Sequence, residues 1–143
     1  MANNKDFQVK NGIQPTVYHE GVGTVTSGSV GYYLAGASYD SKSFSVASQE
    51  GAAGGVQFKS DGTKMYVTGQ ATDSTFQYSL STPYDVSPAS YDSVSFNHTA
   101  QVSNANCYDL FFKTDGTQMY VMFGINDTVY QYALSTAWDL STA

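Results

Sequence analysis

The chain is poor in the residue types on which several common functions depend. Its 143 residues include one cysteine, no arginine and six lysines, against 12 carboxylates. The single cysteine, Cys107, excludes an intrachain disulfide. Nucleic-acid binding requires clustered lysine and arginine to neutralise phosphates, and anionic membranes attract the same clusters, so neither is an expected partner. The net charge of −6 is best explained as a contribution to solubility.

Residues that could form a catalytic or metal site are also scarce. The two histidines, His19 and His98, have no cysteine, aspartate or glutamate at metal-ligand spacing. No Gly-x-Ser-x-Gly motif is present, and there are only two glutamates. Most aspartates recur at equivalent positions of an internal repeat. A residue that recurs in this way usually serves the fold of the repeat, because a catalytic site needs to exist only once in the protein. The sequence therefore predicts no enzyme, no metal and no cofactor.

Long apolar segments are absent as well. Nothing approaches the length of a transmembrane span, so membrane insertion is not expected. After Met1, the mostly polar segment Ala2-Asn-Asn-Lys-Asp6 leads straight into an alternating segment rather than the apolar core of a signal peptide. We therefore expect a protein made in the cytosol without an export signal.

Hydroxyl, aromatic and glycine residues make up much of the remainder. There are 32 serines and threonines, 12 tyrosines, eight phenylalanines and 13 glycines. This mixture favours strands and tight turns over helices. The composition therefore predicts an all-β fold.

An internal repeat is the strongest signal in the sequence. Phe58-Lys-Ser-Asp-Gly-Thr-Lys-Met-Tyr-Val67 returns as Phe112-Lys-Thr-Asp-Gly-Thr-Gln-Met-Tyr-Val121, and residues 58–89 share 17 of 32 identities with residues 112–143, an offset of 54. Ala37-Ser-Tyr-Asp-Ser41 returns as Ala89-Ser-Tyr-Asp-Ser93 at an offset of 52. Strand-like repeats of about 40 to 55 residues are typical of propeller blades and related β arrays.

Each repeat is expected to form four short antiparallel strands. In the first repeat they are residues 55–59, 64–68, 75–80 and 90–96. Asp61-Gly62 supplies the positive φ that a tight hairpin between the first two strands needs. A strand of the fourth type, residues 38–46, precedes the first repeat, and the second repeat lacks its fourth strand. Residues 38–46 are therefore a candidate to complete the last blade of a ring.

Two blades cannot close a ring, because blades bury their flat faces on neighbours and at least about four are needed. Either the 143 residues belong to a longer propeller, or several copies assemble one. Three copies with two blades each would give six, so a homotrimer is the favoured assembly. The sequence ends just inside a repeat, which favours a piece of a longer protein.

The first 36 residues do not take part in the repeat. Phe7 to Ile13 alternates apolar and polar residues and contains Asn11-Gly12, a strong hairpin signal. The following residues include Pro15 and five glycines, which favour an extended β-rich arm. We therefore divide the chain into an N-terminal arm, 1–36, and two repeats, 37–143. The arm residues expected to dock on a partner are Phe7, Val9, Ile13, Val17 and Tyr18.

The best ligand-binding candidates are aromatic. Tyr84 and Trp138 occupy equivalent places after the third strand of each repeat, and Tyr91 opens the fourth strand. An exposed aromatic ring at the edge of a blade can stack on the apolar face of a sugar. The alternative interpretation is that Tyr84 and Trp138 cap their own blades by packing on Leu80 and Leu134.

The repeat, Phe-Lys-x-Asp-Gly-Thr-x-Met-Tyr-Val followed by x-Gln-Tyr-x-Leu-Ser-Thr-x-(Tyr/Trp)-Asp, resembles the propeller-type repeat of virion proteins from marine bacteriophages. The opening Asp6-Phe-Gln-Val-Lys-Asn-Gly12 is similar to the start of structural and fibre proteins in those phages. The resemblance covers about residues 37–143 and implies a non-enzymatic virion component, such as a tail fibre. It also implies that the leading segment docks on other virion proteins and that the repeats project outward towards a host surface.

Two functions from different classes remain open on these residues. The first is a phage fibre or surface appendage that adheres through weak sites repeated on several copies. The second is a soluble lectin-like module whose ring is completed by homo-oligomerisation. A propeller hydrolase is a third possibility, and it would need catalytic residues in blades that these 143 residues do not contain. The receptor, the presence of a bound glycan and the position on the particle stay open.

Overall fold

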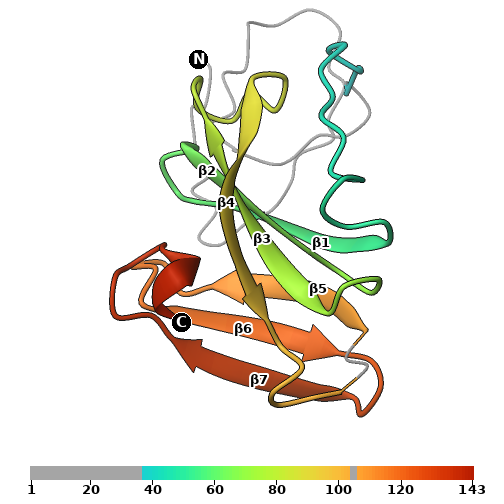
Figure 1. Cartoon of the computed structure of the whole chain (residues 1–143). Helices are drawn as coiled ribbons and strands as arrows, with labels where there is room; N and C mark the ends of the chain where they lie inside the picture. Colours follow the sequence, from blue (N-terminus) through green and yellow to red (C-terminus); the bar gives the residue numbers. More distant parts are fainter. Residues whose placement is uncertain (1–36, 104–105) are drawn as a thin grey trace, which may run out of the picture. The chain divides into compact units, whose positions relative to one another are not determined.

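The computed structural model describes residues 37–103 and 106–143, and the unit Ser38–Ala143 is considered by itself (Figure 1). The five docking residues expected in the arm lie outside the described residues. They are Phe7, Val9, Ile13, Val17 and Tyr18.

The unit is all-β and contains two antiparallel sheets. The first sheet has the strand order β1-β2-β3-β4, with β1 (Ala53–Phe58), β2 (Lys64–Gly69), β3 (Ser74–Leu80) and β4 (Ala89–Asn97). The second sheet has the order β5-β6-β7, with β5 (Cys107–Phe112), β6 (Gln118–Phe123) and β7 (Thr128–Ala133), and a short 3₁₀ helix, η2 (Leu140–Thr142), follows it. The predicted all-β class and the four strands of the first repeat are confirmed. Neither sheet closes on itself, and the two sheets do not by themselves make a propeller.

Both first hairpins turn on an Asp-Gly pair, and this explains why the motif is repeated. Gly62 has a φ of 72° and donates its N–H to the carbonyl of Lys59 at 2.8 Å. The Asp61 carboxylate accepts hydrogen bonds from the N–H and the hydroxyl of Thr63, at 3.0 and 2.7 Å. The second repeat reproduces this geometry around Gly116, whose φ is 73°. The left-handed conformation favours glycine, because a Cβ atom there is strained.

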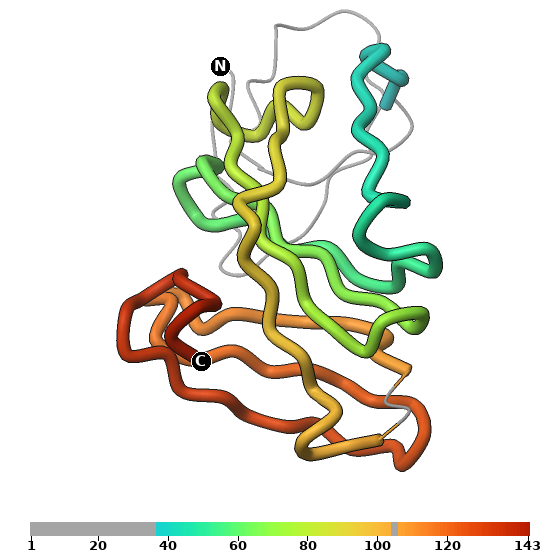
Figure 2. Tube along the Cα trace, viewed as in Figure 1, coloured from blue at the N-terminus to red at the C-terminus, as the bar shows by residue number. Residues whose placement is uncertain are grey.

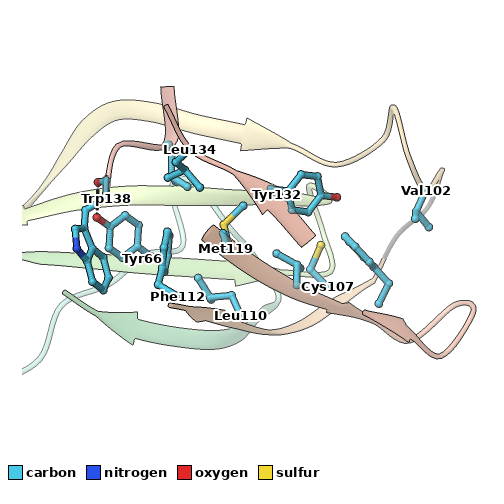
Figure 3. Packing of buried hydrophobic residues seen from close by; sticks show 12 residues of the cluster. Tyr66, Val102, Cys107, Leu110, Phe112, Met119, Tyr132, Leu134 and Trp138 are labelled. Atoms are coloured by element: carbon cyan, nitrogen blue, oxygen red, sulfur yellow. Dashed lines mark hydrogen bonds between the residues drawn. The ribbon is translucent and has the colours of Figure 1, made fainter. Parts of the chain in front are cut away.

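The path of the chain is similar in the two sheets, which lie against each other (Figure 2). β1 and β2 of the first sheet pack against β5 of the second. Because side chains alternate along a strand, Tyr66 of β2 belongs to the core between the sheets, whereas Met65 and Val67 belong to a separate cluster on the other face. The core between the sheets consists mainly of large apolar side chains (Figure 3). Its buried members are Tyr66, Val102, Cys107, Leu110, Phe112, Met119, Val121, Phe123, Tyr132, Leu134, Trp138 and Leu140.

The strand predicted over residues 38–46 is wrong. This segment joins neither sheet and crosses the Met65 and Val67 cluster as an irregular chain, with Phe44 and Val46 packed on that cluster. Lys42 forms an ion pair of 2.7 Å with Asp85. A strand needs the hydrogen-bonding edge of a neighbouring strand. Because residues 38–46 are equivalent to β4 in the repeat, their expected neighbour is the third strand of a sheet. In the first sheet that edge belongs to β4.

Candidate functional site

Tyr84 and Trp138 cover the glycines of the two Asp-Gly turns. Both have positive φ angles, 60° and 65°, and donate their N–H groups to the carbonyls of Gly62 and Gly116, each at 3.0 Å. A Cβ added to Gly62 would lie 2.4 Å from the Tyr84 ring, and one added to Gly116 would lie 2.2 Å from the Trp138 ring. The aromatic position therefore recurs because each ring packs directly on the turn of its own sheet.

The surroundings of these two rings differ. Trp138 is 9% exposed, stacks on Phe112 with the ring centroids 5.1 Å apart and shares the core with Leu134. Tyr84 is 57% exposed, lies 5.9 Å from Phe58 and donates its hydroxyl to the carbonyl of Ser60. The indole of Trp138 is therefore enclosed between the sheets, whereas Tyr84 offers its ring to solvent.

The third predicted ligand residue, Tyr91, is half-buried in β4. Its ring packs on Phe76 and Tyr78, with centroid distances of 6.0 and 5.6 Å. Tyr91 packs against the cluster that contains Met65, and Tyr84 packs against Phe58, which borders the same cluster. Of the three residues, Tyr84 is the one whose geometry is compatible with stacking on an external ligand.

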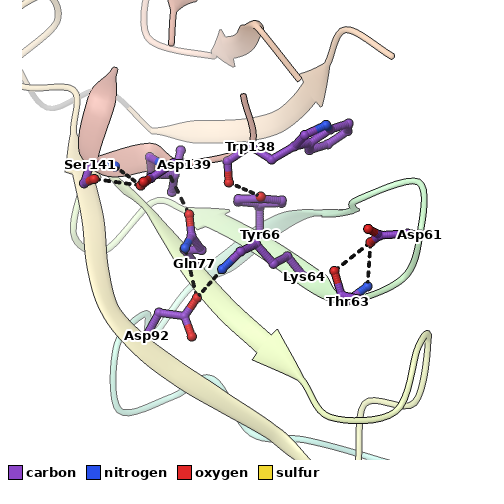
Figure 4. A network of polar contacts seen from close by, with 10 residues as sticks. Asp61, Thr63, Lys64, Tyr66, Gln77, Asp92, Trp138, Asp139 and Ser141 are labelled. Atoms are coloured by element: carbon purple, nitrogen blue, oxygen red, sulfur yellow. Dashed lines mark hydrogen bonds and ion pairs between the residues drawn. The ribbon is translucent and has the colours of Figure 1, made fainter. Parts of the chain in front are cut away.

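Polar contacts fix the position of the first sheet on the second (Figure 4). Tyr66 donates its hydroxyl to the Trp138 carbonyl at 2.6 Å, in a buried setting, and burial raises the pKa of this phenol. The Oε1 atom of Gln77 accepts the N–H of Leu140 at 3.1 Å. A buried donor or acceptor that loses its partner costs about 1–3 kcal/mol, so these two bonds define the relative position of the sheets.

Asp92 holds Gln77 in place for this contact. Its Oδ2 atom accepts the amide of Gln77 at 2.9 Å and pairs with Lys64 at 2.9 Å (Figure 4). Burial would raise the pKa of Asp92, but hydrogen bonds from Ser79, Gln77 and Lys64 outweigh it and lower the pKa. The carboxylate therefore stays charged and orients the Gln77 carbonyl oxygen towards Leu140.

Glu50 is a buried carboxylate that the sequence analysis did not single out. It is 1% exposed and accepts hydrogen bonds from the N–H groups of Ala52, Ala71 and Thr72 and from the Thr72 hydroxyl, at 2.7–3.2 Å. Burial would raise the pKa of Glu50, but these hydrogen bonds together lower it. All of its partners are backbone or hydroxyl groups of two loops, so Glu50 has a structural role. The equivalent residue of the second repeat is Val102, so a comparison of the two repeats does not single out Glu50.

His98 and Cys107 are likewise enclosed. His98 has no exposed surface, its Nε2 lies 2.9 Å from the hydroxyl of Thr75, and burial lowers its pKa to about 4. Burial raises the pKa of the Cys107 thiol to about 11, so it is not an activated nucleophile. Among residues 37–103 and 106–143, no group of three or more histidine, cysteine, aspartate or glutamate side chains could hold a metal ion.

The second sheet carries an exposed apolar surface. We define its outer face by Phe111, Tyr120, Met122 and Val129, of which Phe111, Met122 and Val129 are 58%, 44% and 60% exposed. These residues, with Asp109 and Leu110, line a shallow hollow of about 220 Å³. In the first sheet the equivalent residues are Gln57, Tyr66, Thr68 and Thr75.

A second apolar hollow, of about 260 Å³, lies on the first sheet, on the side away from the second sheet. We call it the first-sheet groove. Its lining includes Phe44, Val46, Val56, Met65, Val67 and Val86. The unit therefore has an apolar surface at each of its two ends, one on the first sheet and one on the second.

Comparisons with protein-family models, curated proteins and solved structures find no match to this chain. Within the described part of the chain, no helix has the length and apolar character needed to cross a membrane.

Proposed function

We propose that the chain is a non-enzymatic component of a bacteriophage virion, a fibre or another surface appendage, in which the two sheets are propeller-type blades. The N-terminal arm docks on other virion proteins, and the blades face the host surface. The observation that carries this proposal is that two similar sheets stack face to face and still leave an apolar surface at each end. Such an arrangement is typical of one segment of a larger array.

Adhesion in such an appendage depends on repetition rather than on one strong site. Several copies in one assembly, with a homotrimer favoured, would present equivalent surfaces whose weak contacts add through effective concentration. The residue that supports a role in adhesion is Tyr84, because its ring packs on Gly62 of the Asp-Gly turn and is 57% exposed. A host-surface glycan is the ligand class that suits an exposed aromatic ring.

Particle incorporation of the full chain tests this function. Replacement of the arm residues Phe7, Val9 and Ile13 by serine is expected to remove the protein from purified particles, while the circular dichroism of the isolated chain stays unchanged. Replacement of Tyr84 by serine is the matched control, which should leave incorporation intact and weaken only the binding of particles to host cells. Normal incorporation of the arm variant would contradict the docking role.

The exposed ring of Tyr84 also supports the second candidate, a lectin-like carbohydrate-binding module. This module needs no particle, so the same arm variant should retain sugar binding in a glycan-array measurement, and the Tyr84 variant should lose it. Sugar binding by the isolated chain together with absence from particles would favour the lectin over the virion component.

A further inference from the structure

The contact between the two sheets is made by surfaces that the repeat carries twice. On the first sheet the contact is made by the side of β2 and β3 that carries Tyr66 and Gln77. These two side chains bond to Trp138 and Leu140, which follow the second sheet in the second repeat. The residues equivalent to Tyr66 and Gln77 on the second sheet are Tyr120 and Gln131, on the side of the outer face. The second sheet therefore repeats the surface by which the first sheet docks.

The opposite surface is repeated as well. The docking site for Tyr66 is formed by Phe112 and Trp138, whose ring centroids lie 4.4 and 6.2 Å from that of Tyr66. The equivalent pair in the first repeat is Phe58 and Tyr84, which lie 5.9 Å apart beside the first-sheet groove. The end of the first sheet thus reproduces the surface on which a sheet docks.

Residues 38–46 extend this match, although they are not a strand. Phe44 packs edge-on against Tyr78 at 5.6 Å and 75°, and its equivalent in β4, Phe96, packs edge-on against Tyr132 at 5.0 Å and 69°. Ser41 and its equivalent Ser93 both have a left-handed φ, 64° and 59°. The segment therefore lies over the first sheet as β4 lies over the second, with the same backbone kink.

Within the part of the chain that the structure describes, the second sheet has no fourth strand equivalent to β4, the strand that this segment resembles. In the first sheet β3 pairs with β4, whereas among residues 37–103 and 106–143 the one strand paired with β7 is β6. The segment of the same chain cannot fill that edge, because it packs on the Met65 and Val67 face, and the first sheet lies between it and the second sheet. A second copy can supply it.

We propose that the outer face and the β7 edge of one copy dock on the first-sheet groove and residues 38–46 of a second copy, head to tail. Tyr120 then lies over Phe58 and Tyr84 of the second copy, and Met122 and Val129 take the places that Thr68 and Thr75 have in the contact within one chain. This inference gives the self-association in the proposed function a surface, and it rests on that self-association but not on adhesion or on docking to a particle.

The repeat also fixes the register of the new strand pair. The register follows from the pairs observed between β3 and β4, such as Thr75 with Phe96. Each β3 residue is replaced by its repeat equivalent 54 residues later, and each β4 residue by its equivalent 52 residues earlier. The expected antiparallel pairs are Thr128 with Ser45, Val129 with Phe44, Tyr130 with Ser43, Gln131 with Lys42, Tyr132 with Tyr39 and Ala133 with Ser38. A head-to-tail contact of this kind produces a ring if its rotation closes and a filament if it does not.

Disulfide trapping tests the register. Ser45→Cys and Thr128→Cys are made in separate full-length chains that carry tags of different length, and the two are mixed under mild oxidation. Directly opposed residues of antiparallel strands have Cα atoms about 4.5–5.5 Å apart, which suits a disulfide. We expect a mixed disulfide between the two chains. The wild type is the background control, since its Cys107 is buried.

A matched control lies two residues out of register. Ser43→Cys with Thr128→Cys places both thiols on the same face but on a diagonal about 7 Å apart, beyond easy bridging. The proposal predicts that the Ser45 pair cross-links at least roughly tenfold faster than the Ser43 pair. Equal rates, or no mixed disulfide from folded chains at any concentration, would overturn it.

Charge substitution tests the face independently. Met122→Glu and Val129→Glu change side chains that are largely exposed in one copy, so the fold should persist. Light scattering should show that wild-type chains associate and that each variant raises the dissociation constant by at least roughly tenfold. Ile125→Glu is the control, because Ile125 is 52% exposed and its equivalent Ala71 is also exposed beside the contact within one chain.

Hydrogen exchange reads out the same event without any substitution. Amides of residues 38–46 and of β7 should gain protection as the wild-type concentration is raised, and those of the β5–β6 turn should not. A wild-type chain that remains monomeric, with no change in exchange at these two segments, would contradict head-to-tail docking whether or not the chain enters particles. A chain that associates but is absent from particles would contradict only the virion role.

Discussion

Tyr84 and Trp138 are equivalent in the repeat, yet one is 57% and the other 9% exposed. We expect Trp138→Ala to destabilise the fold by about 3–5 kcal/mol, because a large ring leaves a cavity between the sheets. Tyr84→Ala should cost about 1 kcal/mol, because the ring is half in water and one hydrogen bond is lost. Urea unfolding followed by circular dichroism measures both. Equal losses in the two variants would contradict the different burial of the rings.

Trp138→Tyr separates the loss of the ring from a change in shape. It gives the second repeat the residue of the first, keeps the contact with Gly116 and retains the carbonyl that accepts the Tyr66 hydroxyl. Its cost should lie well below that of Trp138→Ala. If the two variants were equally unstable, indole packing rather than the presence of an aromatic ring would determine the stability of this turn.

His98 gives the stability a defined pH dependence. Its pKa is about 4 in the folded chain, since burial disfavours the charged ring and the opposing effect of Asp73 is smaller. The ordinary pKa is 6.5, so between pH 6.5 and 4 the unfolded chain binds a proton that the folded chain does not. The stability from the neutral ring is complete above pH 6.5 and falls by about 1.4 kcal/mol for each pH unit below it, down to about pH 4.

His98→Gln removes this titration and is the variant that tests it. The free energy of unfolding of wild type and variant, measured between pH 6.5 and 4.5, should show a steep decline in the wild type and a shallower one in the variant. Glu50, whose pKa is lowered by its hydrogen bonds, is present in both proteins, so its loss of stabilisation as the pH falls towards its ordinary pKa of 4.5 is common to the two curves and cancels in their difference. Parallel curves for the two proteins would show that His98 does not control the acid sensitivity.

At the scale of the hairpin, the two Asp-Gly turns should respond differently to the same substitution. Gly62→Ala and Gly116→Ala both place a Cβ at a positive φ, which costs about 1 kcal/mol. At Gly116 the new methyl group also overlaps Trp138, which is enclosed in the core and cannot move aside, so overpacking adds about 1–3 kcal/mol. At Gly62 the exposed Tyr84 ring can rotate away.

Thermal unfolding of these two variants measures the difference. The midpoint of Gly116→Ala should fall by more than that of Gly62→Ala, and Thr114→Ala, at an exposed position of the same turn, controls for the substitution itself. A larger fall for Gly62→Ala would contradict the ranking based on burial.

Elements governed by local signals could be predicted from the sequence. The four strands of the first repeat were predicted within two residues of β1, β2, β3 and β4, because alternation and the Asp-Gly turn act over a few residues. The segment 38–46 carries the same local pattern as β4, and the prediction of a strand there was wrong. A strand also needs an adjacent edge, and a sequence pattern does not show whether a partner is present.

The candidate site residues also differ in whether local sequence or the packing of the sheets determines their role. That Tyr84 and Trp138 cap their turns follows from their regular recurrence, but their different burial depends on whether a second sheet is stacked on each. The replacement of Thr68 and Thr75 by Met122 and Val129 is visible in the sequence, but the exposure of Met122 and Val129 is not, because the equivalent threonines are buried by the second sheet. The role of Glu50 could not be found from the sequence either, because its partners are backbone groups of loops.

At the scale of the whole molecule, the two sheets form a unit that carries a docking surface at one end and its complement at the other. Within one chain the contact buries Tyr66 completely and encloses Trp138. The same contact between chains would remove Met122 and Val129 from water, which contributes about 25 cal/mol for each Å² of apolar area buried. Stability should therefore depend on association with further copies.

This dependence predicts that the thermal unfolding midpoint of the wild type rises with protein concentration. When association is well above its midpoint, each tenfold rise in concentration adds about 1.4 kcal/mol, which corresponds to roughly 5 °C for a unit of this size. Val129→Glu should unfold at one temperature at all concentrations, equal to that of dilute wild type, while Ile125→Glu should behave as the wild type does. A wild-type midpoint that is independent of concentration would show that the exposed faces of the two sheets do not meet in solution.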